Sequence, residues 1–141
     1  MCIAILLFAS YSVNAQVLAD SAAIKIITRG MQNIYNLEFD EAGEAYNSLT
    51  RMYPGHPVLN LFNGMKIYWE NFPMDPASQA RRAFEDELHR CIEISDKKNY
   101  PGPEYEAEYL LANICARGLL LLFLSENDQS GDVIPLVTSS Y

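Results

Sequence analysis

Few residues of this sequence could carry acid–base or metal chemistry, and most of these are carboxylates. His89 has Glu85 four residues before it and Glu93 four residues after it, which puts the three side chains on one face of a helix. Asp86 and His89 have the spacing of half a di-metal carboxylate site, but the sequence contains no second pair of this kind. A solvated helix face therefore explains these residues better than a metal site.

The remaining candidates for catalysis are a histidine, the two of the three cysteines that lie outside residues 1–15, and the glycines. His56 precedes a proline in a turn, where its side chain is expected to cap a helix or to pack. Cys91 and Cys115 fall on successive predicted helices at different distances from the loop between them, so we expect buried small hydrophobic residues and no disulfide. The glycines form no dinucleotide, P-loop or nucleophile-elbow motif. We therefore expect no catalytic residue, cofactor or metal ion, and no enzyme.

The composition indicates one globular domain with an acidic surface. Of the 141 residues, 50% are hydrophobic and 20% are charged, with 18 Asp and Glu against 10 Lys and Arg and a net charge of -8. A chain of this length can bury a single core. Nucleic acid needs a basic face, so the acidic balance argues against it as a partner, whereas an acidic face attracts basic proteins.

Residues 1–15 have the features of a signal peptide. They contain no charged residue, and Ile3 to Ala9 form an apolar run that is too short to span a bilayer. Val13 and Ala15 are small residues at the -3 and -1 positions of a signal-peptidase site, which would leave Gln16 as the first mature residue. No Lys or Arg precedes the run, and a buried N-terminal helix is the alternative. We expect a periplasmic or secreted protein without a transmembrane span in residues 16–141.

Helix signals alternate with breakers through residues 16–141, and no segment shows the period-two pattern of a strand. Apolar residues three or four apart predict five helices, which are expected to begin at Asp20, Asp40, Pro57, Asp75-Pro76 and about Glu104. The last of them is expected to end near Leu124. A short further helix is expected from Asp132, with the apolar residues Val133, Ile134, Leu136 and Val137. The sequence therefore predicts an all-α protein.

A repeat is visible in these helices. Gly30 and Gly64 lie 34 residues apart, each in the first helix of a predicted pair. In the second helices a small residue is followed four residues later by an aromatic one, with further matches in the first repeat. The residues of this pattern are Ala42, Tyr46, Leu49 and Pro54, then Ala80 and Phe84. On these residues the chain resembles the tetratricopeptide repeat (TPR) family, in particular exported TPR-like proteins with a turn like that at residues 53–57.

The resemblance covers roughly residues 23–124 and implies antiparallel helical hairpins stacked as a short right-handed solenoid. Residues 16–141 would hold about two full repeats and a partial third, with continuation into a longer protein left open. The small residues would let neighbouring helices approach, and Tyr46 and Phe84 would fill the space between successive hairpins. Asn60 and Asn63 stand where the family pattern has large apolar residues. An irregular helical bundle is the alternative.

The resemblance also implies a groove that holds a peptide or a partner helix. Its lining would come from the first helix of each pair, namely Ile27, Met31, Ile34, Tyr35, Leu61, Met65, Tyr68 and Trp69. Methionine adapts to varied shapes, and Tyr and Trp offer large contact areas. The alternative is that this stripe is the core of the domain.

Together these features predict an exported, non-catalytic interaction module or scaffold of the cell envelope, with a protein or peptide as partner. Two alternatives stay open. One is a structural subunit of an envelope nutrient-uptake or secretion assembly, and the other is part of a longer enzyme whose site lies elsewhere. Self-association is expected if the apolar run Leu119–Leu124 stays uncovered.

Overall fold

The computed structural model describes residues 16–97 and 102–126, and the predicted all-α class is confirmed for this part of the chain. Its elements in chain order are α1 (Ser21–Tyr35), α2 (Phe39–Met52), α3 (Pro57–Glu70), α4 (Gln79–Asp96), the 3-10 turn η1 (Pro103–Tyr105) and α5 (Glu106–Glu126). The predicted signal peptide and the short helix expected from Asp132 lie outside the described residues.

Two of the predicted helix starts are confirmed by their caps. The Asp20 carboxylate accepts a hydrogen bond from the backbone N–H of Ala22 and caps α1. At the start of α3, Nδ1 of His56 accepts from the N–H of Val58, and Pro57 occupies the first helical position.

Two other predicted starts are wrong. A tight turn precedes α2: Leu37 lies in the left-handed region at φ 65, and the N–H of Glu38 donates to the carbonyl of Asn33. Because of this turn α2 begins at Phe39, and Asp40 lies inside the helix.

Asp75 instead forms a separate turn before the helix. Its carboxylate accepts a hydrogen bond from the backbone N–H of Ala77, and its backbone carbonyl accepts one from the N–H of Ser78. The Ser78 hydroxyl then caps α4.

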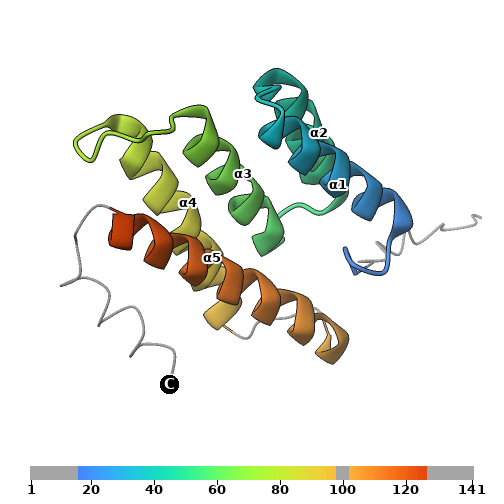
Figure 1. Cartoon of the computed structure of the whole chain (residues 1–141). Helices are drawn as coiled ribbons and strands as arrows, with labels where there is room; N and C mark the ends of the chain where they lie inside the picture. Colours follow the sequence, from blue (N-terminus) through green and yellow to red (C-terminus); the bar gives the residue numbers. More distant parts are fainter. Residues whose placement is uncertain (1–15, 98–101, 127–141) are drawn as a thin grey trace, which may run out of the picture.

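The helices pack mainly against their neighbours in sequence (Figure 1). α1 packs against α2 and α3 against α4, each pair forming an antiparallel hairpin, and α5 packs against α4 and α3. α3 contacts every other α-helix of the described residues. The arrangement therefore grows along the chain, with α3 as its shared element.

Two clusters of buried side chains form the core. The first lies between α1, α2 and the start of α3, where Ile34 and Leu49 are fully buried. The second lies between α3, α4 and α5 and contains Phe84 and Phe123. Trp69 packs against both clusters, so α3 joins the two halves of the core.

The residues predicted to pack the repeats differ in their burial. A Cβ on Gly30 would lie 2.5 Å from the Phe62 ring of α3, and one on Gly64 would lie 2.8 Å from Leu88 of α4. Of the other predicted packing residues, Ala42, Leu49 and Phe84 are fully buried, Tyr46 and Ala80 are half-buried, and Pro54 is exposed. Pro54 therefore does not pack between helices and lies in the turn after α2.

The polar residues that depart from the family pattern are used between α3 and α4. The side-chain amides of Asn60 and Asn63 donate to the two oxygens of Glu87, at 2.6 Å and 3.0 Å. A charged acceptor with two amide donors makes strong hydrogen bonds. The hairpin is therefore joined by a polar contact where the family pattern has an apolar one.

α5 is long and apolar. The segment Pro103–Glu126 is the one helix of the described residues that could cross a membrane by length and composition, and 44% of its most apolar window is buried in the protein. One face packs against α3 and α4, which accounts for the buried part. The expected absence of a transmembrane span in residues 16–141 stays a prediction.

The close packing of α2 predicts a sharp response to added volume. Ala42 is 0% exposed, so Ala42→Leu should lower the free energy of unfolding by about 1–3 kcal/mol. Ala22→Leu, at an exposed position of α1, is the matched control and should change stability little. Denaturant unfolding measures both, and equal stability of the two variants would contradict the packing.

Candidate functional site

Three aromatic side chains form a surface at the ends of α1 and α3, which we call the aromatic ridge: Tyr35, Trp69 and Phe72. The ring centroids of Tyr35 and Trp69 lie 5.8 Å apart, and those of Trp69 and Phe72 lie 5.6 Å apart. Tyr35 is 61% exposed and Phe72 is 54% exposed, whereas Trp69 is half-buried. The ridge is thus anchored in the core at its centre and open to partners at both ends.

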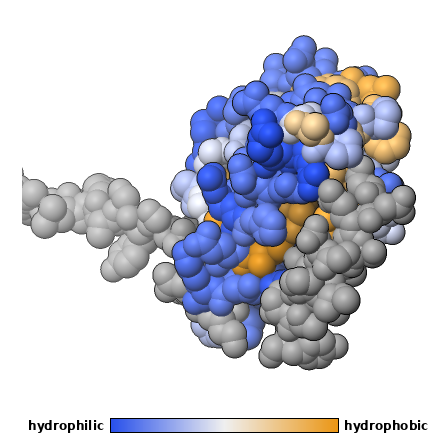
Figure 2. All heavy atoms as spheres, turned by 90° about the vertical axis from the view of Figure 1, so that its left-hand side faces the viewer, coloured by the Kyte–Doolittle hydropathy of each residue, from blue (hydrophilic) through white to orange (hydrophobic). Residues whose placement is uncertain are grey.

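A pocket of about 210 Å³ lies beside Phe72, between the α3–α4 loop and the end of α5. Its walls are Tyr68, Phe72, Pro73, Met74, Phe123 and Glu126. The Tyr68 hydroxyl donates to the Glu126 carboxylate at 2.6 Å, and burial raises the pKa of Tyr68 to about 12. Figure 2 views the side of the molecule on which this loop and the end of α5 lie, and hydrophobic side chains appear there among hydrophilic ones.

The predicted groove residues are divided between the core and this surface. Ile34 is buried and lines no open groove, so the prediction is wrong for it. Tyr68 is also buried, and it contributes only to a wall of the pocket beside Phe72. The half-buried members pack against the core clusters, namely Ile27, Met31, Leu61, Met65 and Trp69. Of the eight residues, Tyr35 alone is exposed. When a helix packs against other helices on two sides, these helices bury its apolar stripe. Only side chains near the helix ends then stay exposed.

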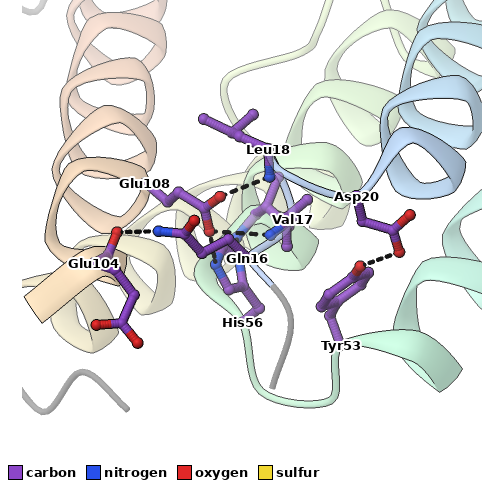
Figure 3. A network of polar contacts seen from close by, with 9 residues as sticks. Gln16, Val17, Leu18, Asp20, Tyr53, His56, Glu104 and Glu108 are labelled. Atoms are coloured by element: carbon purple, nitrogen blue, oxygen red, sulfur yellow. Dashed lines mark hydrogen bonds and ion pairs between the residues drawn. The ribbon is translucent and has the colours of Figure 1, made fainter. Parts of the chain in front are cut away.

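A second candidate site is polar and is not among the sites predicted from the sequence. It is the buried pair His56 and Glu108 (Figure 3). Glu108 of α5 accepts from the backbone N–H groups of Val17 at 3.1 Å and Leu18 at 2.6 Å. Nε2 of His56 faces Glu108 Oε2 at 3.4 Å, and the side chain of Gln16 donates to the carbonyl of Glu104. This network, the N-terminal latch, ties residues 16–18 to α3 and α5.

The surroundings of His56 favour its neutral form. Burial lowers the pKa of His56 below its ordinary value of 6.5, although the nearby Glu108 opposes this in part. Protonation would place a hydrogen on Nδ1, which already accepts from the N–H of Val58. The other groups around the ring are Tyr53, at 6.5 Å between centroids, and Tyr109, at 4.9 Å. His56 is therefore a neutral helix cap.

Glu108 stands with Glu104 and Glu106 in an acidic stretch of the sequence at the start of α5. It is in fact only 6% exposed. The residues that surround it on this side of the helix are Tyr105, three positions before it, and Tyr109 and Ala112, one and four positions after it. All three are buried. This apolar setting in the sequence is the signal that could have placed its carboxylate inside the protein.

A small cavity of about 110 Å³ adjoins the latch and is lined by His56, Glu108, Cys115 and apolar side chains. Cys115 is exposed, and this corrects the expectation that both cysteines are buried. Cys91 is buried, its thiol faces the carbonyl of Ala112, and burial raises its pKa to about 12. Because both ring nitrogens of His56 are directed elsewhere, His56 is not positioned as a base for Cys115.

The acidic and histidine residues noted in the sequence do not gather into a metal site within residues 16–97 and 102–126, where no group of three or more potential ligands is found. His89 is exposed on α4. Glu85 pairs with Arg81 at 2.8 Å, and Glu93 with Lys97 at 2.7 Å. Each of the two glutamates is therefore engaged by a basic residue four positions away in the sequence.

Comparisons of the chain with protein-family models, curated proteins and solved structures found no match. The resemblance to the tetratricopeptide repeat family therefore stays a prediction from the sequence pattern. The ridge, the pocket and the latch are the features from which a function can be inferred.

The latch predicts a pH-dependent stability. The unfolded chain binds a proton at His56 more readily than the folded one, so the free energy of unfolding should fall as the pH drops through about 6.5. His56→Asn keeps a capping acceptor but cannot titrate, and thermal melts between pH 7.5 and 5.5 should show a weaker dependence for it. His89→Asn, at an exposed histidine, is the control that should keep the wild-type dependence. A His56→Asn profile equal to the wild type would contradict this prediction.

Proposed function

We propose that this chain is an exported, non-catalytic interaction module built from TPR-like helical hairpins, and that the aromatic ridge binds a protein or peptide partner of the cell envelope. The observation that carries the proposal is the exposure of Tyr35 and Phe72 on a ridge whose centre, Trp69, is fixed in the core. Large aromatic side chains on rigid helix ends are typical of binding hot spots, because little side-chain entropy is lost on contact.

The helix packing supports the repeat part of the proposal. α1 with α2 and α3 with α4 are successive hairpins, and each further helix contacts the ones just before it. Gly30 and Gly64, which lie 34 residues apart, both stand where a neighbouring helix leaves no room for a Cβ. Stacked hairpins with small residues at the same position are what a helical repeat requires.

The charge of the chain indicates which partners would suit the ridge. The net charge is -8, and the pocket beside Phe72 combines aromatic walls with the carboxylate of Glu126. Aromatic faces and a carboxylate attract the side chains of Lys and Arg, including their apolar stems. We therefore expect a partner segment that carries a basic residue next to apolar ones.

Removal of the exposed rings should separate binding from stability. Tyr35→Ala and Phe72→Ala are expected to weaken the capture of envelope proteins at least about tenfold, while thermal melting changes little because both rings are mostly exposed. Met52→Ala, which alters a 40% exposed residue at the opposite end of the first hairpin, is the matched control. The proposed function fails if the double variant retains every partner that the wild type recovers from the envelope fraction.

Export predicts a defined N-terminus. The protein purified from its own cells should begin at Gln16 and should be recovered outside the cytoplasm, because Val13 and Ala15 form the expected cleavage site. Intact-mass measurement of the native protein, after cell fractionation, decides this. A chain that keeps residues 1–15 in the soluble cytoplasmic fraction would rule out export.

A further inference from the structure

The outer face of α5 is apolar and carries no charge. α5 is the last helix of the described array and lies at its edge (Figure 1). Leu110 and Ile114 are 57% and 58% exposed, and Leu111 and Leu122 are both 49% exposed. Every exposed residue between Glu106 and Ser125 is uncharged, namely Ala107, Leu110, Leu111, Ile114, Cys115, Gly118 and Leu122. Exposed apolar surface of this extent marks a contact site.

Six of these residues form a narrow band along the helix, which we call the α5 stripe. A helix turns by about 100° per residue, which places all six within an arc of about 100°. The members of the α5 stripe are Ala107, Leu111, Ile114, Cys115, Gly118 and Leu122. A band of this width is the kind of face that a single partner helix covers.

The α5 stripe has the same spacing in both directions from a midpoint between Ile114 and Cys115. If two copies of α5 lie antiparallel with these midpoints together, each member stands at the same height as one member of the other copy. Such a pair has two-fold symmetry, in which the same surface of both copies is used. The residues at equal height are then Ile114 and Cys115, Leu111 and Gly118, and Ala107 and Leu122.

Each of these three pairs joins a large side chain to a small one. Close packing between helices needs this alternation, because two large side chains at one height would force the helices apart. Gly118 is the smallest member, and a Cβ placed there would meet nothing within 4 Å in the monomer. The space beside Gly118 is therefore free to receive Leu111 of a second copy. The α5 stripe is complementary in size to itself.

The charged residues at the ends of α5 are compatible with the same arrangement. In the antiparallel register, Glu104 stands at the height of Ser125 of the second copy, and Glu126 at the height of Pro103. Carboxylates of the two copies are thus not placed opposite each other, although the chain has a net charge of -8. Like charges in contact would oppose association, so an uncharged face is the one on which two acidic chains can meet.

We propose that a second copy of this chain covers the α5 stripe, as an antiparallel helix pair with its two-fold axis between Ile114 and Cys115. The inference goes beyond the proposed function and does not depend on the aromatic ridge, which lies at the ends of α1 and α3. One helix from each copy makes a small interface, below roughly 1,200 Å², and contacts of this size are typical of weak and reversible dimers.

Gly118→Leu in the full chain separates the dimer from the fold. The monomer has room for the new side chain, and leucine is a better helix former than glycine, so melting of the monomer should not be lowered. In the dimer the leucine would meet Leu111 of the second copy. The dissociation constant, measured by sedimentation equilibrium, should therefore rise at least about tenfold.

An exchange of the large and the small residue should restore the dimer. Adding Leu111→Ala to Gly118→Leu moves the bulk to the other member of the same pair, and most of the lost affinity should return. Ala22→Leu, which adds the same kind of bulk to an exposed position of α1, is the matched control and should leave the dissociation constant unchanged.

Cross-linking tests the register of the pair. Chains with Cys2→Ser and Cys115→Ser receive either Ala107→Cys or Leu122→Cys, and the remaining Cys91 is buried. The two positions 107 of one dimer would lie about 22 Å apart along the axis, whereas position 107 stands level with position 122 of the second copy. A thiol cross-linker much shorter than 22 Å should therefore join the chains only when the two variants are mixed.

Three results would overturn the proposal. The first is a wild-type protein that stays monomeric up to about 1 mM. The second is a dimer that keeps its affinity in Gly118→Leu or is cross-linked in either cysteine variant alone, because another face or a parallel pair would then be used. The third is a dimer that dissociates in the variant with Tyr35→Ala and Phe72→Ala, which would place the contact at the aromatic ridge.

Discussion

The absence of a side chain at two positions determines how these helices can pack. Phe62 of α3 lies so close to Gly30 of α1 that any Cβ there would overlap its ring, and a Cβ on Gly64 would lie only 2.8 Å from Leu88 of α4. Because α3 takes part in both contacts, the two hairpins share one packing centre and their two core clusters meet at Trp69. Close packing of this kind resists both added and removed volume, so the position of the ridge at the end of α3 follows from contacts made deep in the core.

The N-terminal latch closes the other end of the same helices. A buried carboxylate is costly unless its hydrogen bonds are satisfied, and Glu108 is satisfied by two backbone N–H groups that come from residues 17 and 18. The segment before α1 thus supplies Glu108 of α5 with hydrogen-bond donors from outside the helices. Val17 is 1% exposed beside these bonds, so apolar burial and a polar contact act together at this residue.

Much of the fold could be predicted from periodicity, because helices with an apolar stripe and clear breakers are the strongest local signals. Asp20 and Pro57 marked true helix starts, whereas Asp40 and Asp75 did not, since a tight turn and a competing Asx-type turn shifted those boundaries. The groove prediction placed Tyr68 on the surface because periodicity shows which side of a helix is apolar and not how many neighbours that side touches. Glu108 was missed for a related reason, since its partners are backbone groups 90 residues away.

The surface that stays apolar after folding carries the argument about function. A helix end such as that of α1 could have presented polar side chains at no cost to the core, yet Tyr35 keeps its ring against Trp69 while most of it faces water. Exposed aromatic rings give up hydrophobic stabilisation that only a partner can return. The same reasoning applies to the outer face of α5, where Leu110 and Ile114 are more than half exposed. In a helical repeat protein, each further hairpin buries the apolar faces of the helices before it. Apolar side chains that stay exposed at the helix ends are available for binding.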